Sequence, residues 1–250
     1  MLLTQRRADR VVLHNVSWQQ FENLLADLGE SRAARVTYDD GTLEIITPLP
    51  EHEYYKETLS IAIKDIAETL EQDYESLGST TWKRELKRAG VEPDNCFYFQ
   101  NEPKIRGKLE FDLNQDPPPD LALEIDFISC PVKYLHFGGN KAEGRGQRAE
   151  GKEEACKVEG YDNCLSGNDV TSKSLSRFPI YARLGVPEIW CYDSGEVTIY
   201  QLQNEEYIEV ETSLVFPTLP VKELPALIEQ YRLQGKLAIS KAVREWAKSR

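Results

Sequence analysis

Long apolar runs are absent from these 250 residues. The apolar stretches, such as 11–13 and 61–63, span only a few residues, whereas a membrane-spanning helix needs about 20. No membrane partner is therefore expected. Residues 1–10 carry three arginines but no apolar segment follows them, so a secretory signal is not expected either.

Cysteine is scarce and its number is odd, since only five cysteines occur in the chain. A framework of disulfides needs an even number, and it is typical of short secreted chains. This usage favours a reducing, cytoplasmic location.

Positive charge is also in deficit, because 30 Lys and Arg face 42 Asp and Glu, for a net charge of −12. The phosphate backbone would repel such a chain, so a nucleic-acid role requires a local basic patch or a metal ion. The best local patch combines Lys83, Arg84, Lys87 and Arg88, although a solvated face explains these residues equally well. High solubility is the simpler interpretation of the acidity.

Local patterns predict an N-terminal helix followed by a hairpin. Ser17 and Gln20 form a capping-box pattern that opens a helix, and Gly29 ends it. Residues 39–41 read Asp-Asp-Gly between alternating segments, which is a strong hairpin signal. A long amphipathic helix is expected over 51–73.

The rest of the chain predicts strands over 75–85, 91–99 and 120–127, and then a helix over 172–185 that starts or kinks near Pro179. A strand at 188–192, a hairpin from 197–200 and 207–210, and helices at 224–232 and 237–248 complete the order. The predicted fold class is α/β, with a mixed sheet flanked by helices in one domain over 11–250. Residues 1–10 are expected to be flexible.

Composition changes abruptly at 131–170, which holds seven of the fifteen glycines, six Lys or Arg and seven Asp or Glu. This stretch lacks an apolar period, and loops of such length are uncommon inside a domain. We interpret it as a long disordered insertion. Cys130, Cys156, Cys164 and His136 lie in or beside it, but their spacing matches no familiar zinc pattern.

Glu124 is the most informative polar residue, because it interrupts an otherwise apolar strand. A buried carboxylate is costly unless it is paired or binds a metal. Asp94 opens the preceding strand, and two neighbouring strands can bring both carboxylates together as a Mg²⁺ site for phosphoryl chemistry. The alternative is that Asp94 caps a turn after Pro93 and Glu124 pairs with an internal Arg or Lys.

Three segments, 90–98, 118–126 and 178–190, resemble the Uma-two family of the PD-(D/E)XK nuclease superfamily. The helix at 17–21, the hairpin at 39–44 and the helix start at 50–52 resemble it as well, in the same order. The resemblance implies a restriction-endonuclease-like mixed β-sheet flanked by helices, with an N-terminal helix and hairpin.

The same resemblance assigns roles to individual carboxylates. It implies that Asp94 and Glu124 hold the metal, Mg²⁺ or Mn²⁺. Asp120 forms a second Pro-Asp pair and, four residues before Glu124, would share its face of the strand and assist. Further acids could come from Glu51 or Glu44. His52 follows Pro50-Glu51 as in the family, although a histidine at a helix start is more often a capping residue.

The chain departs from the nuclease pattern at Asp126, where a lysine is expected. In the Uma-two family the basic residue is thought to come from the following helix, where Arg177 occupies the matching position and Lys173 lies one turn earlier. Either could contact the phosphate. A general-base role is doubtful for Arg177, because arginine does not readily lose its proton.

The leading hypothesis is therefore a Mg²⁺-dependent endonuclease that hydrolyses DNA, with a homodimer as a possible assembly because cutting both strands needs two sites. The first alternative is a catalytically degenerate relative that binds nucleic acid or protein without cleavage. The second is a folded remnant without activity. Asp126 and the insertion between the metal strand and the basic helix favour these alternatives.

Overall fold

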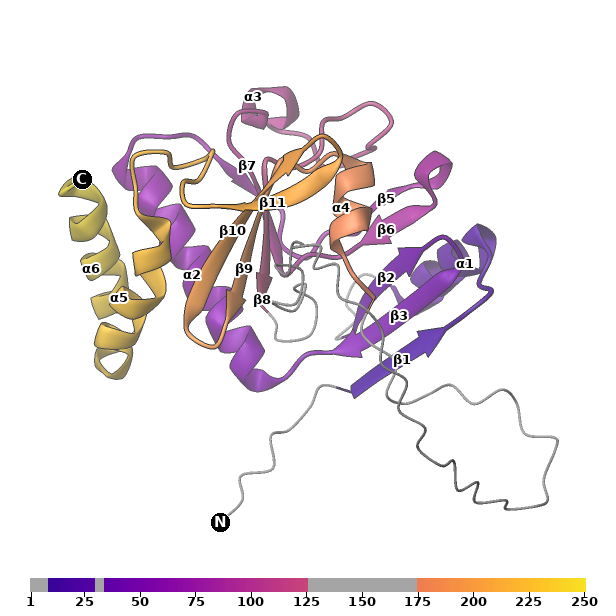
Figure 1. Cartoon of the computed structure of the whole chain (residues 1–250), viewed down its shortest axis with the longest axis horizontal. Coiled ribbons are helices and arrows are strands. Elements are labelled where there is room, and N and C mark those ends of the chain that lie inside the picture. Colours follow the sequence, from indigo (N-terminus) through magenta and orange to yellow (C-terminus); the bar gives the residue numbers. More distant parts are fainter. Residues whose placement is uncertain (1–8, 30–33, 126–174) are drawn as a thin grey trace, which may run out of the picture.

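The computed structural model describes residues 9–29, 34–125 and 175–250. It has two β-sheets flanked by helices, as Figure 1 shows, which confirms the predicted mixed α/β class. In these three ranges no helix combines the length and apolar character that a membrane span requires. The predicted insertion at 131–170 lies outside the described residues.

The first sheet is antiparallel and has the strand order β1-β3-β2-β6-β5. Helix α1 packs on one of its faces, where Phe21 stacks on Tyr38 and belongs to one buried cluster with Val36 and Leu43. The elements are β1 (Asp9–Leu13), α1 (Trp18–Leu28), β2 (Arg35–Asp39), β3 (Thr42–Thr47), β5 (Trp82–Arg84) and β6 (Ala89–Val91).

The predicted local signals in this sheet are confirmed. Ser17 caps α1 and exchanges the two hydrogen bonds of a capping box with Gln20. The β2–β3 hairpin turns at Asp40 and Gly41, both with positive φ, which is the conformation that a tight hairpin turn favours.

The second sheet has the order β11-β10-β9-β8-β7-β4, and only its β8–β9 pair is parallel among the pairings described. Helix α4 (Phe178–Leu184) lies in the chain between these two parallel strands. The strands are β4 (Glu75–Ser76), β7 (Asn95–Tyr98), β8 (Leu121–Ile125), β9 (Glu188–Asp193), β10 (Glu196–Gln203) and β11 (Glu206–Val210).

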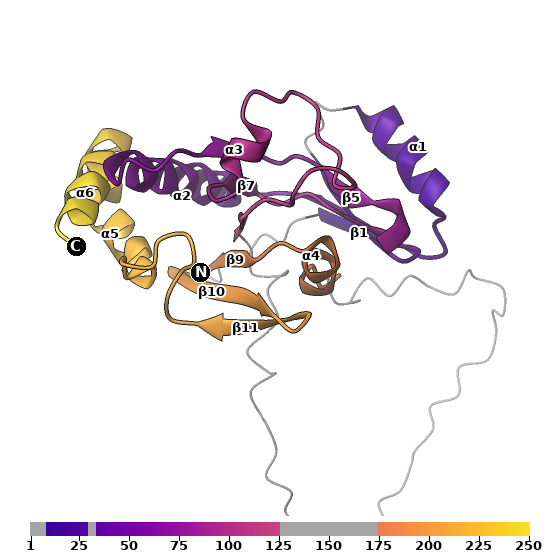
Figure 2. The ribbon, with the colours of Figure 1, turned by 90° about the horizontal axis from the view of Figure 1, so that it is seen from above.

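Three helices form the main core with one face of the second sheet. They are α2 (Pro50–Thr69), α5 (Leu224–Tyr231) and α6 (Lys236–Lys248), and they lie together at one end of the molecule in Figures 1 and 2. Leu59, Ile63 and Ile66 of α2 pack against Leu123 and its neighbours on this face. Short helical turns occur at α3 (Glu102–Ile105), η1 (Glu85–Lys87), η3 (Val221–Glu223) and η4 (Arg232–Gln234).

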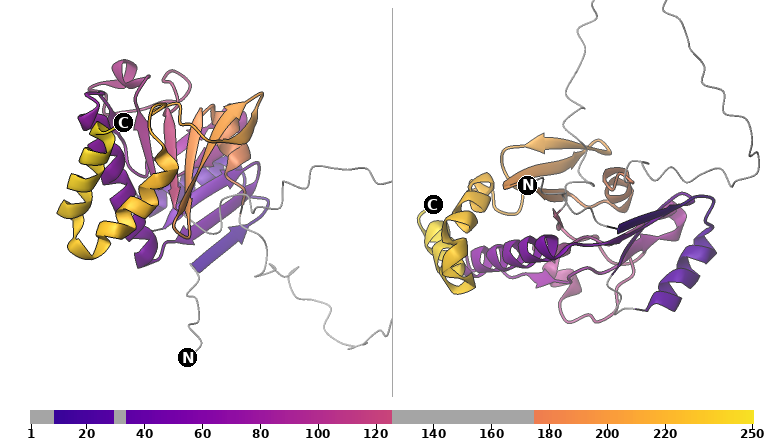
Figure 3. Two further views of the ribbon diagram at one scale, coloured as in Figure 1. Left: turned by 60° about the vertical axis from the view of Figure 1, so that its left-hand side comes forward. Right: turned by 90° about the horizontal axis from the view of Figure 1, so that it is seen from below.

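The opposite face of the second sheet is covered by α4 and by strands β5 and β6 of the first sheet. Figure 3 shows α4 in the space between the two sheets, with α1 on the far side of the first sheet. The chain therefore places one face of each sheet toward a shared interior, and that interior contains polar side chains.

The structure corrects three sequence predictions. The expected strand 91–99 is divided at Pro93, where the chain leaves β6 of the first sheet and enters β7 of the second. Proline has no N–H for a sheet ladder, which suits this crossing. The expected strand 75–85 is likewise divided into β4 and β5. Residues 9 and 10, expected to be flexible, belong to β1.

Helix α4 begins next to Pro179, as predicted, and ends at Gly185, which has a left-handed φ of 86°. The predicted part of this helix before 175 lies outside the described residues. The two C-terminal helices agree with their predicted positions within one residue, and the strands of the β10–β11 hairpin within three.

Candidate active site

Asp94 and Glu124 face each other across two neighbouring strands. The β7–β8 register pairs Asn95 with Leu123, and continuing it by one residue brings Asp94 opposite Glu124. The Asp94 N–H donates to the Leu123 carbonyl at 3.1 Å, and the Ile125 N–H donates to Asp94 Oδ2 at 2.5 Å. Both carboxylates are buried, with 0% and 2% exposure. The sequence prediction that these two acids meet is therefore correct.

Helix α4 holds the carboxylate of Glu124 from two positions one turn apart. Arg177, at the N-cap, donates from Nη1 to Glu124 Oε2 at 2.5 Å. The Tyr181 hydroxyl donates to Oε1 of the same carboxylate. Burial, and then the negative charge of Glu124, raise the pKa of Tyr181, so this hydroxyl remains protonated and can donate. Glu124 thus pairs with an internal arginine, as the structural alternative predicted.

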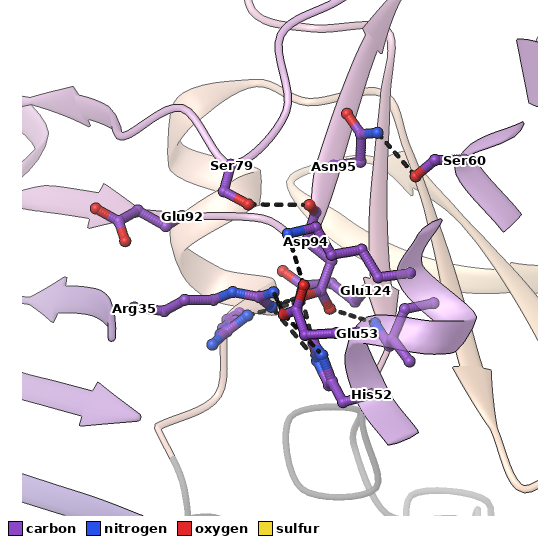
Figure 4. Close-up of polar contacts among 12 residues, drawn as sticks. Arg35, His52, Glu53, Ser60, Ser79, Glu92, Asp94, Asn95 and Glu124 are labelled. Carbon is purple, nitrogen blue, oxygen red and sulfur yellow. Dashed lines mark hydrogen bonds and ion pairs between the residues drawn. The ribbon is translucent and has the colours of Figure 1, made fainter. Parts of the chain in front are cut away.

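Arg35 brings a second guanidinium to the site from β2 of the first sheet. Its Nη1 forms an ion pair with Asp94 Oδ1, and its Nη2 donates to Glu53 Oε1 at 3.1 Å (Figure 4). Burial, followed by the positive charge of Arg177, lowers the pKa of Arg35. The site is therefore assembled from both sheets.

Glu92 fixes the link between the sheets immediately before Asp94. Its buried carboxylate accepts from the backbone N–H of Val36 at 3.0 Å and from the Thr81 hydroxyl at 2.6 Å. Since Val36 follows Arg35 on β2, these bonds hold the strand of Arg35 against the Glu92–Asp94 segment.

The first turn of α2 completes the cluster at its more exposed side. His52 Nε2 lies 3.2 Å from Asp94 Oδ1, and His52 Nδ1 lies 3.6 Å from Glu53 Oε1. The Glu53 side chain is 46% exposed, in contrast to 13% for His52. Burial, together with the charges of Arg35 and Arg177, lowers the pKa of His52 to about 3, so its ring is neutral at pH 7.

The ligand types in this cluster suit a hard divalent cation. Mg²⁺ is commonly held by one or two carboxylates, with water and substrate oxygens completing its shell, and Asp94 and Glu124 supply that share. In the part of the chain that the structure describes, no group of three or more His, Cys, Asp or Glu side chains forms a ready metal cage. The pair fits such an ion by ligand chemistry rather than by a preformed cage.

Asp120 is not brought to this cluster. It precedes Glu124 by four residues, or about 13 Å along an extended strand, which is too far for both to bind one ion. Its carboxylate accepts from the Phe99 and Asn101 N–H groups at 2.7 and 2.8 Å, and from Asn101 Nδ2 at 2.6 Å. The expected assistance from Asp120 is thus corrected to a structural role in the 99–101 turn.

The other predicted acids differ in their placement. Glu44 is fully buried on β3, accepts from the Leu175 N–H at 3.2 Å, and lies 3.8 Å from Arg10. Glu51 is exposed on α2 and lies one residue before His52. Lys173 and Asp126 lie outside the described residues, as do Cys130, His136, Cys156 and Cys164.

The basic group that was considered for DNA binding is largely engaged in contacts within the chain. Lys83 pairs with Glu22 at 2.5 Å, and Arg88 pairs with Asp40. Arg84 donates to a backbone carbonyl. These contacts favour the interpretation of this group as a solvated, self-paired face.

Arg35, Glu53 and Tyr181 are the members that sequence reasoning missed. Arg35 alternates with Val36 on a strand whose other face packs on α1, so an inward arginine was detectable there as an unexplained buried charge. Tyr181 could have been found from its spacing of four residues from Arg177, which places both on one face of a helix. Glu53 has no comparable signal.

Comparison with known proteins finds one family whose model covers the region of Asp94 and Glu124. Residues 18–129 match the model of the Uma2 family, whose description reads "Putative restriction endonuclease". The similarity to the Uma2 family covers these residues only, which are less than half of the chain. No curated protein matches the chain. The matched region contains Asp94 and Glu124, whereas Arg177 and Tyr181 lie beyond it.

Proposed function

We propose that this protein is a divalent-cation-dependent endonuclease that hydrolyses DNA phosphodiester bonds. The observation that carries the proposal is the buried pair of Asp94, immediately before β7, and Glu124 on β8, which face each other in the region that is similar to the Uma2 family. Two converging carboxylates surrounded by guanidinium groups are suited to a metal ion and a phosphate together.

In this proposal Asp94 and Glu124 hold Mg²⁺ or Mn²⁺. When bound, such an ion activates water and neutralises charge on the phosphate. Arg177 and Tyr181 orient the carboxylate of Glu124 through the hydrogen bonds described above. Arg177 also supplies fixed positive charge where negative charge develops on the phosphate, while proton abstraction is not assigned to it.

Two further parts of the proposal come from the sequence. Lys173 remains a candidate contact to the phosphate from the stretch before α4. A homodimer would supply the two sites that cleavage of both DNA strands requires. Because the chain carries a net charge of −12, the metal ion and the arginines would have to offset repulsion of the DNA backbone.

A catalytically degenerate binding protein is the second candidate. The ion pairs of Arg35 with Asp94 and of Arg177 with Glu124 favour it, because they balance both carboxylates without a metal. Asp126, at the position of the expected lysine, favours it as well. This protein would retain DNA or a protein partner without cleaving it.

Cleavage of supercoiled plasmid in Mg²⁺ or Mn²⁺ tests the proposal. The wild-type chain should nick the plasmid, and Glu124→Gln should reduce the rate at least a hundredfold. Glu102→Gln is the matched control. Glu102 is as buried as Glu124 and also pairs with an arginine, Arg106, but it lies on α3 and is not part of the Asp94–Glu124 site. Equal cleavage by wild type and Glu124→Gln would contradict the proposal.

Plasmid cleavage by a variant that lacks residues 131–170 shows whether the site is competent for cleavage without this stretch. Cleavage only after this deletion would mean that the insertion disables a competent site. If neither chain cleaves but both retain labelled DNA in a shift assay, the binding candidate replaces the nuclease.

A further inference from the structure

Two cations and two anions balance each other in the buried centre of the site. Asp94 and Glu124 contribute two negative charges, and Arg35 and Arg177 contribute two positive charges. All four charged side chains are at most 8% exposed. The centre therefore has a net charge of zero before any ligand enters.

A divalent cation would change this balance to +2 in a place where uncompensated charge is costly. A phosphodiester brings one negative charge and offsets half of the charge that the cation adds. Glu53, in contact with Arg35 and Lys56, lies at the edge of the cluster with or without the ligands. The cation therefore binds at lower cost together with the phosphodiester than alone.

We propose that Arg35 is a displaceable counter-ion of Asp94, which competes with the divalent cation and makes cation and phosphodiester bind cooperatively. This inference rests on the proposed function for the identity of the ligands. In the free protein the guanidinium of Arg35 neutralises Asp94. When the cation binds Asp94, Arg35 keeps its bond to Glu53 and turns its positive charge to the phosphodiester.

The contacts of Arg35 distinguish it from Arg177 in this respect. Arg35 spans a fully buried acid and a half-exposed one, so it has a second partner when Asp94 is taken by the cation. Arg177 pairs with a carboxylate that Tyr181 also holds, and both partners of that pair are buried. Arg35 moreover comes from the other sheet, so its displacement leaves the β7–β8 ladder intact.

Mn²⁺ affinity of the full-length chain, measured by electron paramagnetic resonance, tests the proposal without any cleavage. Arg35→Gln should bind Mn²⁺ about tenfold more tightly than wild type in the absence of DNA. Arg183→Gln is the matched control, because Arg183 pairs with Asp39 on the same strand β2. It should bind Mn²⁺ as wild type does. Equal or weaker Mn²⁺ binding by Arg35→Gln would overturn the proposal.

Cooperativity is measured with a phosphorothioate DNA duplex, which is charged but resists hydrolysis. The duplex should raise the Mn²⁺ affinity of wild type by at least tenfold and that of Arg35→Gln by clearly less. Mn²⁺ should raise the affinity for the duplex by the same factor, because the coupling is reciprocal. Equal coupling in both proteins would contradict the role of Arg35.

Loss of Arg35 can also destabilise the fold, because it leaves Asp94 buried without its counter-ion. If Arg35→Gln is unfolded in chelator, the proposal expects Mn²⁺ to restore its circular dichroism, since the ion replaces the missing charge. Failure of millimolar Mn²⁺ to restore folding would overturn the inference.

The two proposals can fail separately. Tighter Mn²⁺ binding by Arg35→Gln without plasmid cleavage by any chain would support the counter-ion and contradict the nuclease. Plasmid cleavage that depends on Glu124, with no gain in Mn²⁺ affinity for Arg35→Gln, would support the nuclease and contradict the counter-ion role of Arg35.

Discussion

Arg177 and Glu124 form an ion pair of 2.5 Å in which both side chains are at most 4% exposed. The pair joins β8, which ends at Ile125, to α4, which begins at Phe178. More than fifty residues of sequence separate its partners. The contact therefore joins β8, which carries Glu124, to α4, which carries Arg177 at its N-cap, although residues 126–174 separate the two elements in the sequence.

Loss of Arg177 should strongly destabilise the protein. Breaking a buried ion pair by removing one partner leaves an uncompensated charge and costs about 3–5 kcal/mol of unfolding free energy. Urea unfolding should show this loss for Arg177→Gln, and a smaller one for Arg177→Lys, which keeps the charge. Arg106→Gln should lose clearly less, because the Arg106 side chain is 58% exposed. Equal losses in Arg177→Gln and Arg106→Gln would contradict a buried pair.

Removal of the Tyr181 hydroxyl should cost more than removal of a tyrosine hydroxyl with a neutral partner. Tyr181 donates to a carboxylate, and such bonds contribute about 1.5–3 kcal/mol, whereas bonds to neutral groups contribute about 0.5–1.5 kcal/mol. Tyr207 provides the comparison, because its hydroxyl donates to the Val186 carbonyl. Urea unfolding of Tyr181→Phe and Tyr207→Phe measures the difference. A larger loss for Tyr207→Phe would contradict a charged Glu124.

Local features of the fold could be predicted because they depend on neighbours in sequence. The Ser17 capping box, the turn at Gly41 and the start of α4 at Pro179 each follow from the chemistry of a few adjacent residues. The division of the 91–99 segment at Pro93 could not be predicted in this way. Its two halves belong to different sheets, and that choice depends on long-range pairing.

The site shows the same contrast. Asp94 and Glu124 could be placed together because their strands are adjacent and each acid interrupts an apolar pattern. Arg35 could not be placed beside these acids, since its strand β2 belongs to the other sheet and is linked to Asp94 through β6 and the contact of Glu92 with Val36. Asp120 was misplaced because its Pro-Asp pattern resembles that of Asp94, while it lies just before β8 and four residues from Glu124.

Cys96 should be inert toward thiol reagents in the folded protein. Burial raises the pKa of its thiol to about 12, and the thiolate is the reactive form. Alkylation with iodoacetamide at pH 8, followed by peptide mass spectrometry, should leave Cys96 unmodified until urea is added. The unfolded thiol has a lower pKa near 9, so this group should reduce stability as the pH rises above about 9. Rapid native alkylation of Cys96 would contradict its burial.

Asp94 and Asp120 should respond differently to the same amide substitution. Asp94→Asn should lower Mn²⁺ affinity at least tenfold, since it removes one of two proposed ligands. Asp120→Asn should leave Mn²⁺ affinity within twofold of wild type, because its carboxylate is occupied by the 99–101 turn. Its effect should instead appear in urea unfolding, as a loss of about 1–3 kcal/mol from a weakened buried acceptor.

Paired Mn²⁺ titrations and urea unfolding of the two variants give the answer. Both should first be shown to be folded by circular dichroism, so that a loss of ion binding is not a loss of structure. If Asp120→Asn weakened Mn²⁺ binding as much as Asp94→Asn, Asp120 would belong to the metal site after all. The strand β8 would then have to bend, because about 13 Å of extended chain separates Asp120 from Glu124.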